Sequence, residues 1–256
     1  MADSTDDAIE VLARRVPLLR VLADGPRSKR TLVEELSLSR STIDRAVRDL
    51  EALGFVARND GVSLTLQGRL ALDAYEEFAD TAAAVDEASA VLDPLPADAT
   101  VDTALLRGAD VVGPDPVSPQ RPFVAYKRLV SEATAARGFA PAVLGDNVAV
   151  FRDRIVEDGL VADLTVSADA LDELVSAYAD PVNDALETGR LTLRRATTTL
   201  EYGLMLLELP ERTVVTALVY DDRGLTGTIR NDAPAAVRWA EGVYEDLREA
   251  ATPLDR

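Results

Sequence analysis

A short stretch of the chain carries arginine and hydroxyl side chains at a spacing that suits contact with a nucleic acid. Counted at ~100° per residue along a helix, Ser41, Arg45 and Arg48 lie on one side, opposite Ile43 and Val47. An arginine can donate two hydrogen bonds to guanine or to phosphate, and short hydroxyls near a helix N-terminus suit the phosphate backbone. We therefore expect one face of this helix to pack and the other to contact DNA.

The charge of this stretch is opposite in sign to that of the whole chain. Residues 27–48 carry a net charge of +3, whereas the 256-residue chain carries −18, which leaves −21 for the remaining residues. A basic stretch in an acidic protein favours a polyanionic partner. The alternative is that Arg45 and Arg48 only solvate the helix or pair with Asp44 and Asp49.

Residues on both sides of the helix extend the candidate interface. Ser39 and Arg40 stand at its start, and Arg58 and Asn59 precede an Asp-Gly pair that favours a tight hairpin turn, from which they could reach a minor groove or the backbone. The predicted contacts with double-stranded DNA are made by Lys29, Arg30, Ser39, Arg40, Ser41, Thr42, Arg45, Arg48, Arg58 and Asn59.

The elements around these residues follow the order of a winged helix-turn-helix. Apolar side chains recur at helical spacing up to Gly54, and two short β-like stretches flank the hairpin turn. Pro17 either kinks the first helix or opens a second one, and either Ser28 or Thr31 caps the next. The expected elements are a helix over residues 6–23, a short helix over 31–36, a turn over 37–39, a helix over 40–53 and strands over 55–58 and 62–66.

Beyond the hairpin, helical spacing continues over residues 67–92, and Pro94 and Pro96 then break it. This helix is long enough to connect two domains or to act as a dimer arm. The fold class is therefore expected to be mixed α/β. Its parts are a winged helix-turn-helix domain over residues 1–66, a connector or dimerisation helix over 67–95 and a mixed α/β effector or assembly domain over 96–256.

The C-terminal part alternates between strand and helix patterns. Four prolines between Pro114 and Pro122 predict an irregular loop, and one βαβ unit predicts two neighbouring parallel strands. Short turns at Pro210-Glu211 and at residues 222–224 predict antiparallel hairpins. The expected elements are helices over 123–137, 147–158, 167–186 (interrupted by Pro181) and 233–249, with strands over 139–144, 160–166, 191–195, 202–209, 213–220 and 225–230.

The composition excludes several classes of catalytic site. The chain has no cysteine and no histidine, which excludes disulfides, thiolate zinc sites and imidazole bases. Carboxylate sites for Mg²⁺ or Ca²⁺ stay open, so one alternative is a carboxylate-metal nuclease or phosphatase with an accessory winged helix. Because the acids are spread along the chain, we predict a protein that is not an enzyme, with no catalytic residue, metal or cofactor.

Sequence features also bear on location. No apolar run approaches the ~20 residues needed to span a bilayer, and the start MADSTDD lacks the basic and apolar regions of a secretory signal. We expect a cytoplasmic protein with no membrane partner.

The positive charges are almost all arginine, with Lys29 and Lys127 as the two lysines, while aspartate is abundant. Such a composition resembles that of salt-loving archaea, in which an acidic, hydrated surface keeps proteins soluble and salt screens their self-repulsion. The alternative is an ordinary acidic protein.

The segment LVEELSLSRSTIDRAVRDLEALGFVARNDGVSLTLQGRLAL resembles an archaeal winged-helix transcription regulator. The segments GFAPAVLGDNVAVFRDRIVEDGLVADLTV and ALVYDDRGLTGTIRNDAPAAVRWAEGVYEDLREAATPL resemble the C-terminal effector domain of archaeal regulators typified by a methanogenesis regulator. The resemblance implies a homodimer that binds operator DNA and responds to a signal through its C-terminal domain. It places DNA contacts on Ser39, Arg40, Ser41, Thr42 and Arg45. The effector domain is also similar to the phospholipase-D-like domains of archaeal sugar regulators, and the absent histidines make any such ancestry inactive here.

The C-terminal domain is too large for a spacer, and mixed α/β sheets often bind ligands beyond the carboxyl ends of parallel strands. We therefore predict a small-molecule sensor, with dimerisation without a ligand as the alternative; a winged helix can also serve as a protein-interaction module. The polar residues near predicted strand or helix ends that could line such a site are Arg152, Arg154, Arg194, Arg195, Glu201 and Glu208.

Overall fold

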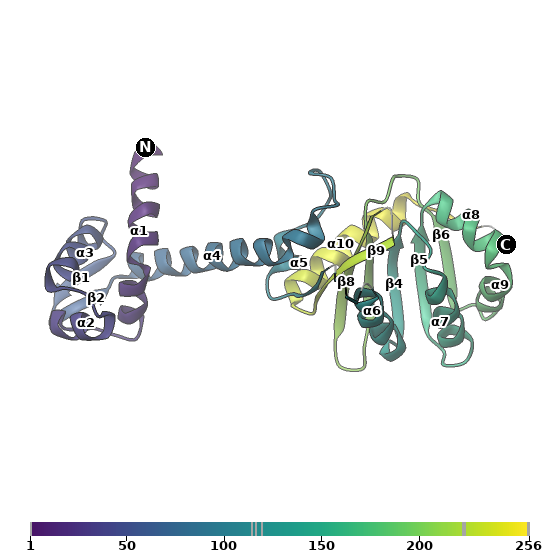
Figure 1. Cartoon of the computed structure of the whole chain (residues 1–256), viewed down its shortest axis with the longest axis horizontal. Coiled ribbons are helices and arrows are strands. Elements are labelled where there is room, and N and C mark those ends of the chain that lie inside the picture. The colour runs from purple at the N-terminus through teal and green to yellow at the C-terminus, as the bar shows by residue number, and fades with distance from the viewer. Residues whose placement is uncertain (1, 114, 116, 119, 222–223, 255–256) are drawn as a thin grey trace. The chain divides into compact units, whose positions relative to one another are not determined.

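The computed structural model describes residues 2–113, 115, 117–118, 120–221 and 224–254. Two compact units make up the chain, residues 1–82 and residues 83–256 (Figure 1). The long helix α4 (Leu66–Leu92) contributes residues to both units.

The first unit is a winged helix-turn-helix, as the order of its predicted elements requires. Its elements are α1 (Ala2–Ala23), α2 (Lys29–Leu36), α3 (Arg40–Ala52), β1 (Val56–Asn59), β2 (Gly61–Leu64) and the start of α4. The wing is an antiparallel hairpin with Asn59 opposite Gly61, and Arg27 adds an antiparallel bridge to Val62. The unit closes over an apolar core whose fully buried side chains include Leu19, Leu22, Leu32, Ile43, Val47 and Leu50.

Two details of the first unit settle points that the sequence left open, namely the effect of Pro17 on the first helix and the cap of the second. The helix α1 continues through Pro17, so no second helix opens there; the buried side chains Val16 and Leu18 lie on both sides of the proline. Ser28 caps α2, because its hydroxyl accepts a hydrogen bond from the Thr31 amide at 3.1 Å. The helix therefore starts at Lys29 rather than at Thr31.

The start of α4 lies close against the residue that leads into the wing. The amide of Thr65 donates to the Phe55 carbonyl at 3.0 Å, and the Thr65 hydroxyl donates to the Gly54 carbonyl at 2.6 Å. Gly68 follows one turn later, and a Cβ placed on it would lie 1.9 Å from the Phe55 carbonyl oxygen. Only glycine fits this contact.

The second unit is built on one mixed sheet with the strand order β10-β6-β5-β4-β7-β8-β9-β3. The pairs β4·β5 and β5·β6 are parallel and the others are antiparallel, which confirms the predicted βαβ unit and the two predicted hairpins. The strands are β3 (Asp110–Val112), β4 (Ala135–Ala140), β5 (Val161–Val166), β6 (Leu191–Arg195), β7 (Gly203–Glu208), β8 (Thr213–Asp221), β9 (Gly224–Asn231) and β10 (Thr252–Pro253).

Helices cover both faces of this sheet. Figure 1 shows α6 (Arg121–Glu132) and α7 (Gly145–Val156) on one face and α10 (Pro234–Ala250) on the other. The core under α10 also includes the short helix α5 (Thr103–Leu106) and the end of α4, whereas the cores on the opposite face include α8 (Ala168–Ala177) and α9 (Ala179–Glu187). The unit is thus a three-layer arrangement, helix on sheet on helix.

Several predicted boundaries in the second unit are wrong. The predicted helix over 123–137 ends at Glu132, and the strand expected over 139–144 instead runs over Ala135–Ala140, because Ala136 and Phe139 are buried within the sheet. The helical stretch after Ser167 breaks at Tyr178, so Pro181 lies in the first turn of α9, where a missing amide is tolerated.

The short elements α5, β3 and β10 were not predicted, since each is too brief to show a period. Of the predicted loop of prolines, Pro114, Pro116 and Pro119 lie outside the described residues, as do residues 222–223 of the last hairpin turn.

The contact at Gly68 can be tested by a glycine-to-alanine substitution. Gly68→Ala forces a methyl group against the Phe55 backbone, and we expect it to lower the free energy of unfolding by about 1–3 kcal/mol. Gly242→Ala, in the interior of α10 with open space around it, is the matched control and should raise stability by about 0.5–1 kcal/mol. Thermal unfolding followed by circular dichroism measures both, and equal effects of the two substitutions would contradict the packing described here.

Candidate functional site

The helix α3 has one packed face and one free face. Ile43, Val47 and Leu50 are fully buried, whereas Ser41, Arg45 and Arg48 are exposed. Ser39 and Arg40 at the start of the helix are exposed as well, and Thr42 is partly so. The predicted division of the helix is thus confirmed, while contact with DNA stays a prediction.

The arginines of the free face differ in their partners. Among the described residues, no ion pair or hydrogen bond joins the side chain of Arg40 or Arg45 to another group. The Arg48 Nε donates to the backbone carbonyl of Asp44 at 3.2 Å, and Asp49 pairs with Arg15 at 2.8 Å. The alternative in which Arg45 pairs with a neighbouring acid is therefore not what the structure shows.

An ion pair joins α2 to α3. The Lys29 ammonium donates to the carboxylate of Asp44, and this hydrogen bond holds the pKa of Asp44 below its usual value, aided by the charges of Lys29, Arg40 and Arg48. Asp44 is therefore ionised and compensated within the helix-turn-helix. Because Lys29 forms this ion pair, its ammonium group is less available to bind a ligand than the guanidinium of Arg45.

Other predicted contact residues also have protein partners. Arg30 pairs with Glu34 at 2.9 Å while its side chain stays 89% exposed, and Arg58 of the wing pairs with Glu51 of α3 at 2.9 Å. Such exposed pairs are worth little and can exchange for a phosphate. Asn59 is exposed at the tip of the hairpin.

The hydroxyl groups organise the N-terminus of α3. The Ser39 side chain accepts from the Thr42 amide at 3.2 Å, and its oxygen lies 2.9 Å from the Ser41 hydroxyl and 2.8 Å from that of Thr42. Ser39 is therefore the N-cap of the helix. The structure brings the three hydroxyls together at the end of the helix that would approach a phosphate.

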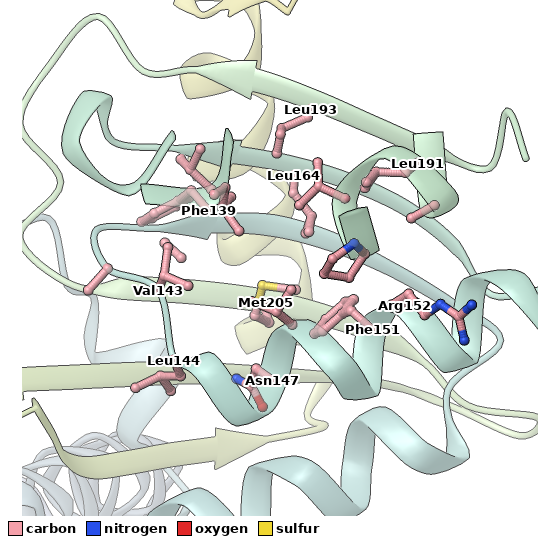
Figure 2. Close-up of a pocket in the computed structure, with 18 of the residues that line it drawn as sticks. Phe139, Val143, Leu144, Asn147, Phe151, Arg152, Leu164, Leu191, Leu193 and Met205 are labelled. Atoms are coloured by element: carbon pink, nitrogen blue, oxygen red, sulfur yellow. The ribbon is translucent and has the colours of Figure 1, made fainter. Parts of the chain in front are cut away.

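A separate feature of the second unit is an apolar cavity of about 120 Å³ between α7, α9 and the sheet (Figure 2). Its walls come from α6, α7, α8, α9 and the strands β4 to β8. The lining side chains are mainly aliphatic or aromatic and include Val143, Val148, Phe151, Leu164, Leu193 and Met205.

Polar groups at this cavity are few. Asn147, in the first turn of α7, lines it, and the Asn147 Oδ1 is buried without a hydrogen-bond partner. Tyr126 and Tyr220 also line it, and burial raises the pKa of both hydroxyls above the ordinary value. These three residues were not predicted as site residues.

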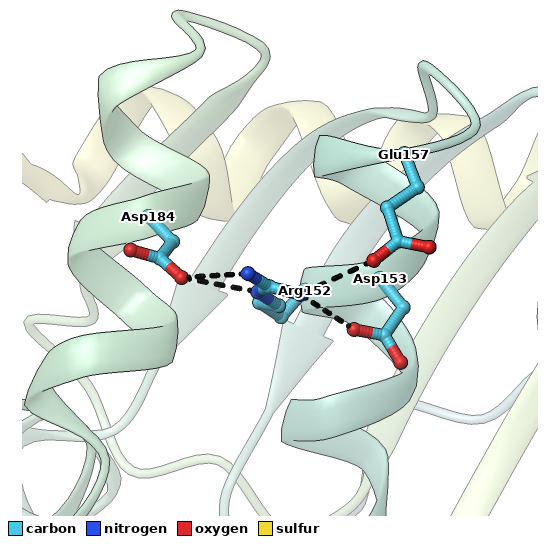
Figure 3. A network of polar contacts seen from close by, with 4 residues as sticks. All are labelled: Arg152, Asp153, Glu157 and Asp184. Atoms are coloured by element: carbon cyan, nitrogen blue, oxygen red, sulfur yellow. Dashed lines mark hydrogen bonds and ion pairs between the residues drawn. The ribbon is translucent and has the colours of Figure 1, made fainter.

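Of the six polar residues considered for an effector site, Arg152 alone lines this cavity within the described part of the chain. Figure 2 shows its guanidinium directed away from Phe151 and Met205. Figure 3 shows the partners of this guanidinium: it donates to Asp184 of α9 at 2.9 and 3.1 Å, to Asp153 of its own helix and to Glu157, which follows the end of that helix. The bonds to Asp153 and Asp184 raise the pKa of Arg152 further above its already high value, and the bond to Asp184 ties α7 to α9.

The other five residues lie elsewhere. Arg154 donates to the Ala133 carbonyl at 2.6 Å and pairs with Asp158, and Arg194 pairs with Asp163. Glu208 lies 3.9 Å from Arg137. Arg195 borders an open polar depression that four threonines also line, and Glu201 is exposed. The structure therefore does not gather these residues into one site.

Among the described residues, no three acidic side chains come together in a way that could hold a metal ion. No helix in the described part of the chain is long and apolar enough to cross a membrane.

Comparison with solved structures finds distant similarities. The chain is similar to TrmBL2, an archaeal chromatin protein, with 14% identity over 96% of this chain and 98% of that one and a TM-score of 0.45. It is also similar to Nuc, a phospholipase D family member from Salmonella typhimurium (10% identity, 58% and 99% coverage, TM-score 0.44), and to NucT from Helicobacter pylori (8% identity, 57% and 98% coverage, TM-score 0.45). Since these TM-scores lie below 0.5, they are no guide to function. No curated protein matches the chain.

Comparison with protein families is more informative. Residues 4–87 match the HVO_A0261 N-terminal domain. Residues 119–250, more than half of the chain, match the middle domain of the methanogenesis regulatory protein FilR1. These matches confirm the resemblance predicted from the sequence, and the chain therefore belongs to the family of the methanogenesis regulatory protein FilR1.

Proposed function

We propose that the chain is a DNA-binding transcriptional regulator that reads its operator with the free face of α3. The observation that carries this proposal is the exposed Arg45, which stands opposite the packed face of α3 with no acidic partner among the described residues. A helix of this kind fits the major groove, where an arginine can donate to both acceptors of a guanine. Membership of a regulator family supports the same function.

The surroundings of Arg45 suit a polyanion. Arg40 and Arg48 flank it, Lys29 compensates Asp44, and the hydroxyls at the N-terminus of α3 can donate to phosphate. Arg30 and Arg58 can release their exposed acidic partners to contact the backbone. We propose that Ser41, Arg45 and Arg48 meet the bases and that the other predicted residues position the unit on the duplex. A protein with this role acts in the cytoplasm, where the genome is.

We further propose that the regulator is a homodimer that uses the exposed face of α4. Leu66, Leu70 and Phe78 are 66%, 55% and 69% exposed, although apolar side chains of this size are usually buried. They recur at intervals of four and eight residues, so they follow one side of the helix. A second copy of the chain would cover them, and its two-fold symmetry would require a pseudo-palindromic operator.

The first prediction concerns Arg45. Arg45→Ala removes the proposed base contact, and we expect a loss of about 1–3 kcal/mol in binding to the operator, enough to abolish a specific complex in a mobility-shift assay. Arg14→Ala is the matched control, because it removes the same charge from an exposed, paired position on α1 and should leave binding nearly unchanged. Equal binding by the Arg45 and Arg14 variants would exclude α3 as the recognition helix.

The next prediction concerns how affinity for DNA depends on salt, and it tests whether the acidic composition adapts the chain to concentrated salt. Release of counterions ordinarily makes affinity fall by several orders of magnitude above about 0.2 M salt. For a chain of net charge −18, screening also removes repulsion between the protein and DNA, so we expect binding to persist in molar KCl and to strengthen with salt. Fluorescence anisotropy over a KCl series measures the affinity for DNA. A steep, ordinary fall in affinity would contradict the adaptation to salt, but it would not contradict the assignment of α3 as the recognition helix.

The dimer is tested on α4. Phe78→Asp places a charge on the proposed interface, and we expect a dimer to become a monomer in size-exclusion chromatography with light scattering. Leu38→Asp, at an apolar residue that is 41% exposed between α2 and α3, serves as the control and should stay dimeric. A monomeric wild-type chain, or a dimeric Phe78→Asp variant, would reject this face as the interface.

A further inference from the structure

The apolar cavity between α7, α9 and the sheet has the properties of a ligand site. We propose that it is the effector site of the regulator and that it takes a compact, uncharged, apolar molecule carrying one hydroxyl group. The regulatory role rests on the proposed function, whereas binding of the ligand depends on the cavity alone.

The size and lining of the cavity set the size of the ligand. Its volume is about 120 Å³, and aliphatic and aromatic side chains such as Val148, Phe151, Leu193 and Met205 form most of its surface. An apolar cavity of about 150 Å³ stays dry and accepts benzene. A single ring or a short branched chain therefore fits the space.

Small residues on the central strand explain why the space exists. Ala136 and Ala140 of β4 alternate with Gly138 on the side of the sheet that faces α7, whereas the neighbouring strands carry Leu164 and Met205 there. A Cβ on Gly138 would lie 2.0 Å from the backbone oxygen of Leu204 on β7, so Gly138 allows the two strands to approach and cannot carry a side chain. Of the three small residues, Ala140 lines the cavity, and a larger side chain there would occupy part of the space.

The Asn147 side chain supplies a polar anchor. Its Oδ1 is buried and accepts no hydrogen bond, and an acceptor left in this state costs stability. An unfilled apolar cavity carries a cost of its own because its lining lacks contacts. Asn147 is one of the residues that line the cavity, and we infer that a ligand with one donating hydroxyl reaches its Oδ1 and relieves both costs.

The electrostatics of the cavity favour a neutral ligand. Tyr126 and Tyr220 keep their protons, since burial raises the pKa of each hydroxyl. Arg152 already forms ion pairs with Asp184, Asp153 and Glu157, as Figure 3 shows. An anion would find no free cation among these lining residues, and a cation would find no free carboxylate there.

Phenol and toluene form a matched pair of probes for the full-length chain. They have nearly the same shape, but toluene lacks the hydroxyl group. At about 10 mM we expect phenol to raise the melting temperature of the second unit by about 2–4 °C, and toluene to raise it less. Isothermal calorimetry should give phenol an affinity about tenfold higher than that of toluene.

Three variants assign the binding to this cavity. Asn147→Leu should raise the melting temperature of the free protein and remove the preference for phenol, while toluene still binds; a purely structural Asn147 would lower that temperature. Val148→Phe should fill the space and abolish the response to both probes. Ala149→Leu, on the exposed side of α7, is the control and should behave like the wild type.

The outcomes separate this proposal from the proposed function. No response of the wild type to either probe, or an unchanged response of Val148→Phe, overturns the ligand site even if the chain binds DNA. A response to phenol that requires Asn147 supports the site even if the chain fails to bind DNA, and that failure would remove only its regulatory role.

Discussion

Burial of one apolar stripe on α3 fixes which side chains this helix can present to a partner. Ile43, Val47 and Leu50 have no exposed surface, and burying such a side chain contributes about 1.5–3 kcal/mol. The exposed ion pairs around the helix contribute at most about 1 kcal/mol each. Packing therefore decides the rotation of the helix, and the arginines follow from it. Their outward direction is a consequence of the core, so it does not depend on DNA being present.

In the second unit the candidate site arises from incomplete packing, which leaves the apolar cavity between α7, α9 and the sheet. Where β4 carries Ala140, the layer between α7 and the sheet is left incomplete, and Asn147, whose Oδ1 accepts no hydrogen bond, lines the same cavity. A protein that only needed a stable scaffold could fill this layer with a larger aliphatic side chain at Ala140 or Val148. The arrangement is understandable if the space has a use, and it lies where the polar network of Arg152 joins the two flanking helices.

The sequence predicted the first unit well because its signals are local. Helical spacing, the turn over residues 37–39 and the Asp-Gly turn each act within a few residues, and together they specify α2, α3 and the wing. In the second unit, β4 was misplaced by four residues, since its alternation of alanine, glycine and arginine resembles a continuation of α6 until pairing with β7 is known. The cavity could not be predicted, because it depends on residues from strands and helices that are distant in the sequence. A run of small residues on a buried strand, Ala136-Gly138-Ala140, was the one signal available for it.

The contact between Gly68 and Phe55 has a mechanical consequence for the first unit. Because no atom separates the start of α4 from the backbone that leads into β1, and because Thr65 bonds to both Gly54 and Phe55, this end of the helix cannot roll or slide without carrying the hairpin along. A rotation of α4 about its axis would therefore move the wing, because no flexible side chain lies between them to absorb the motion. One glycine makes the junction rigid enough to transmit torque.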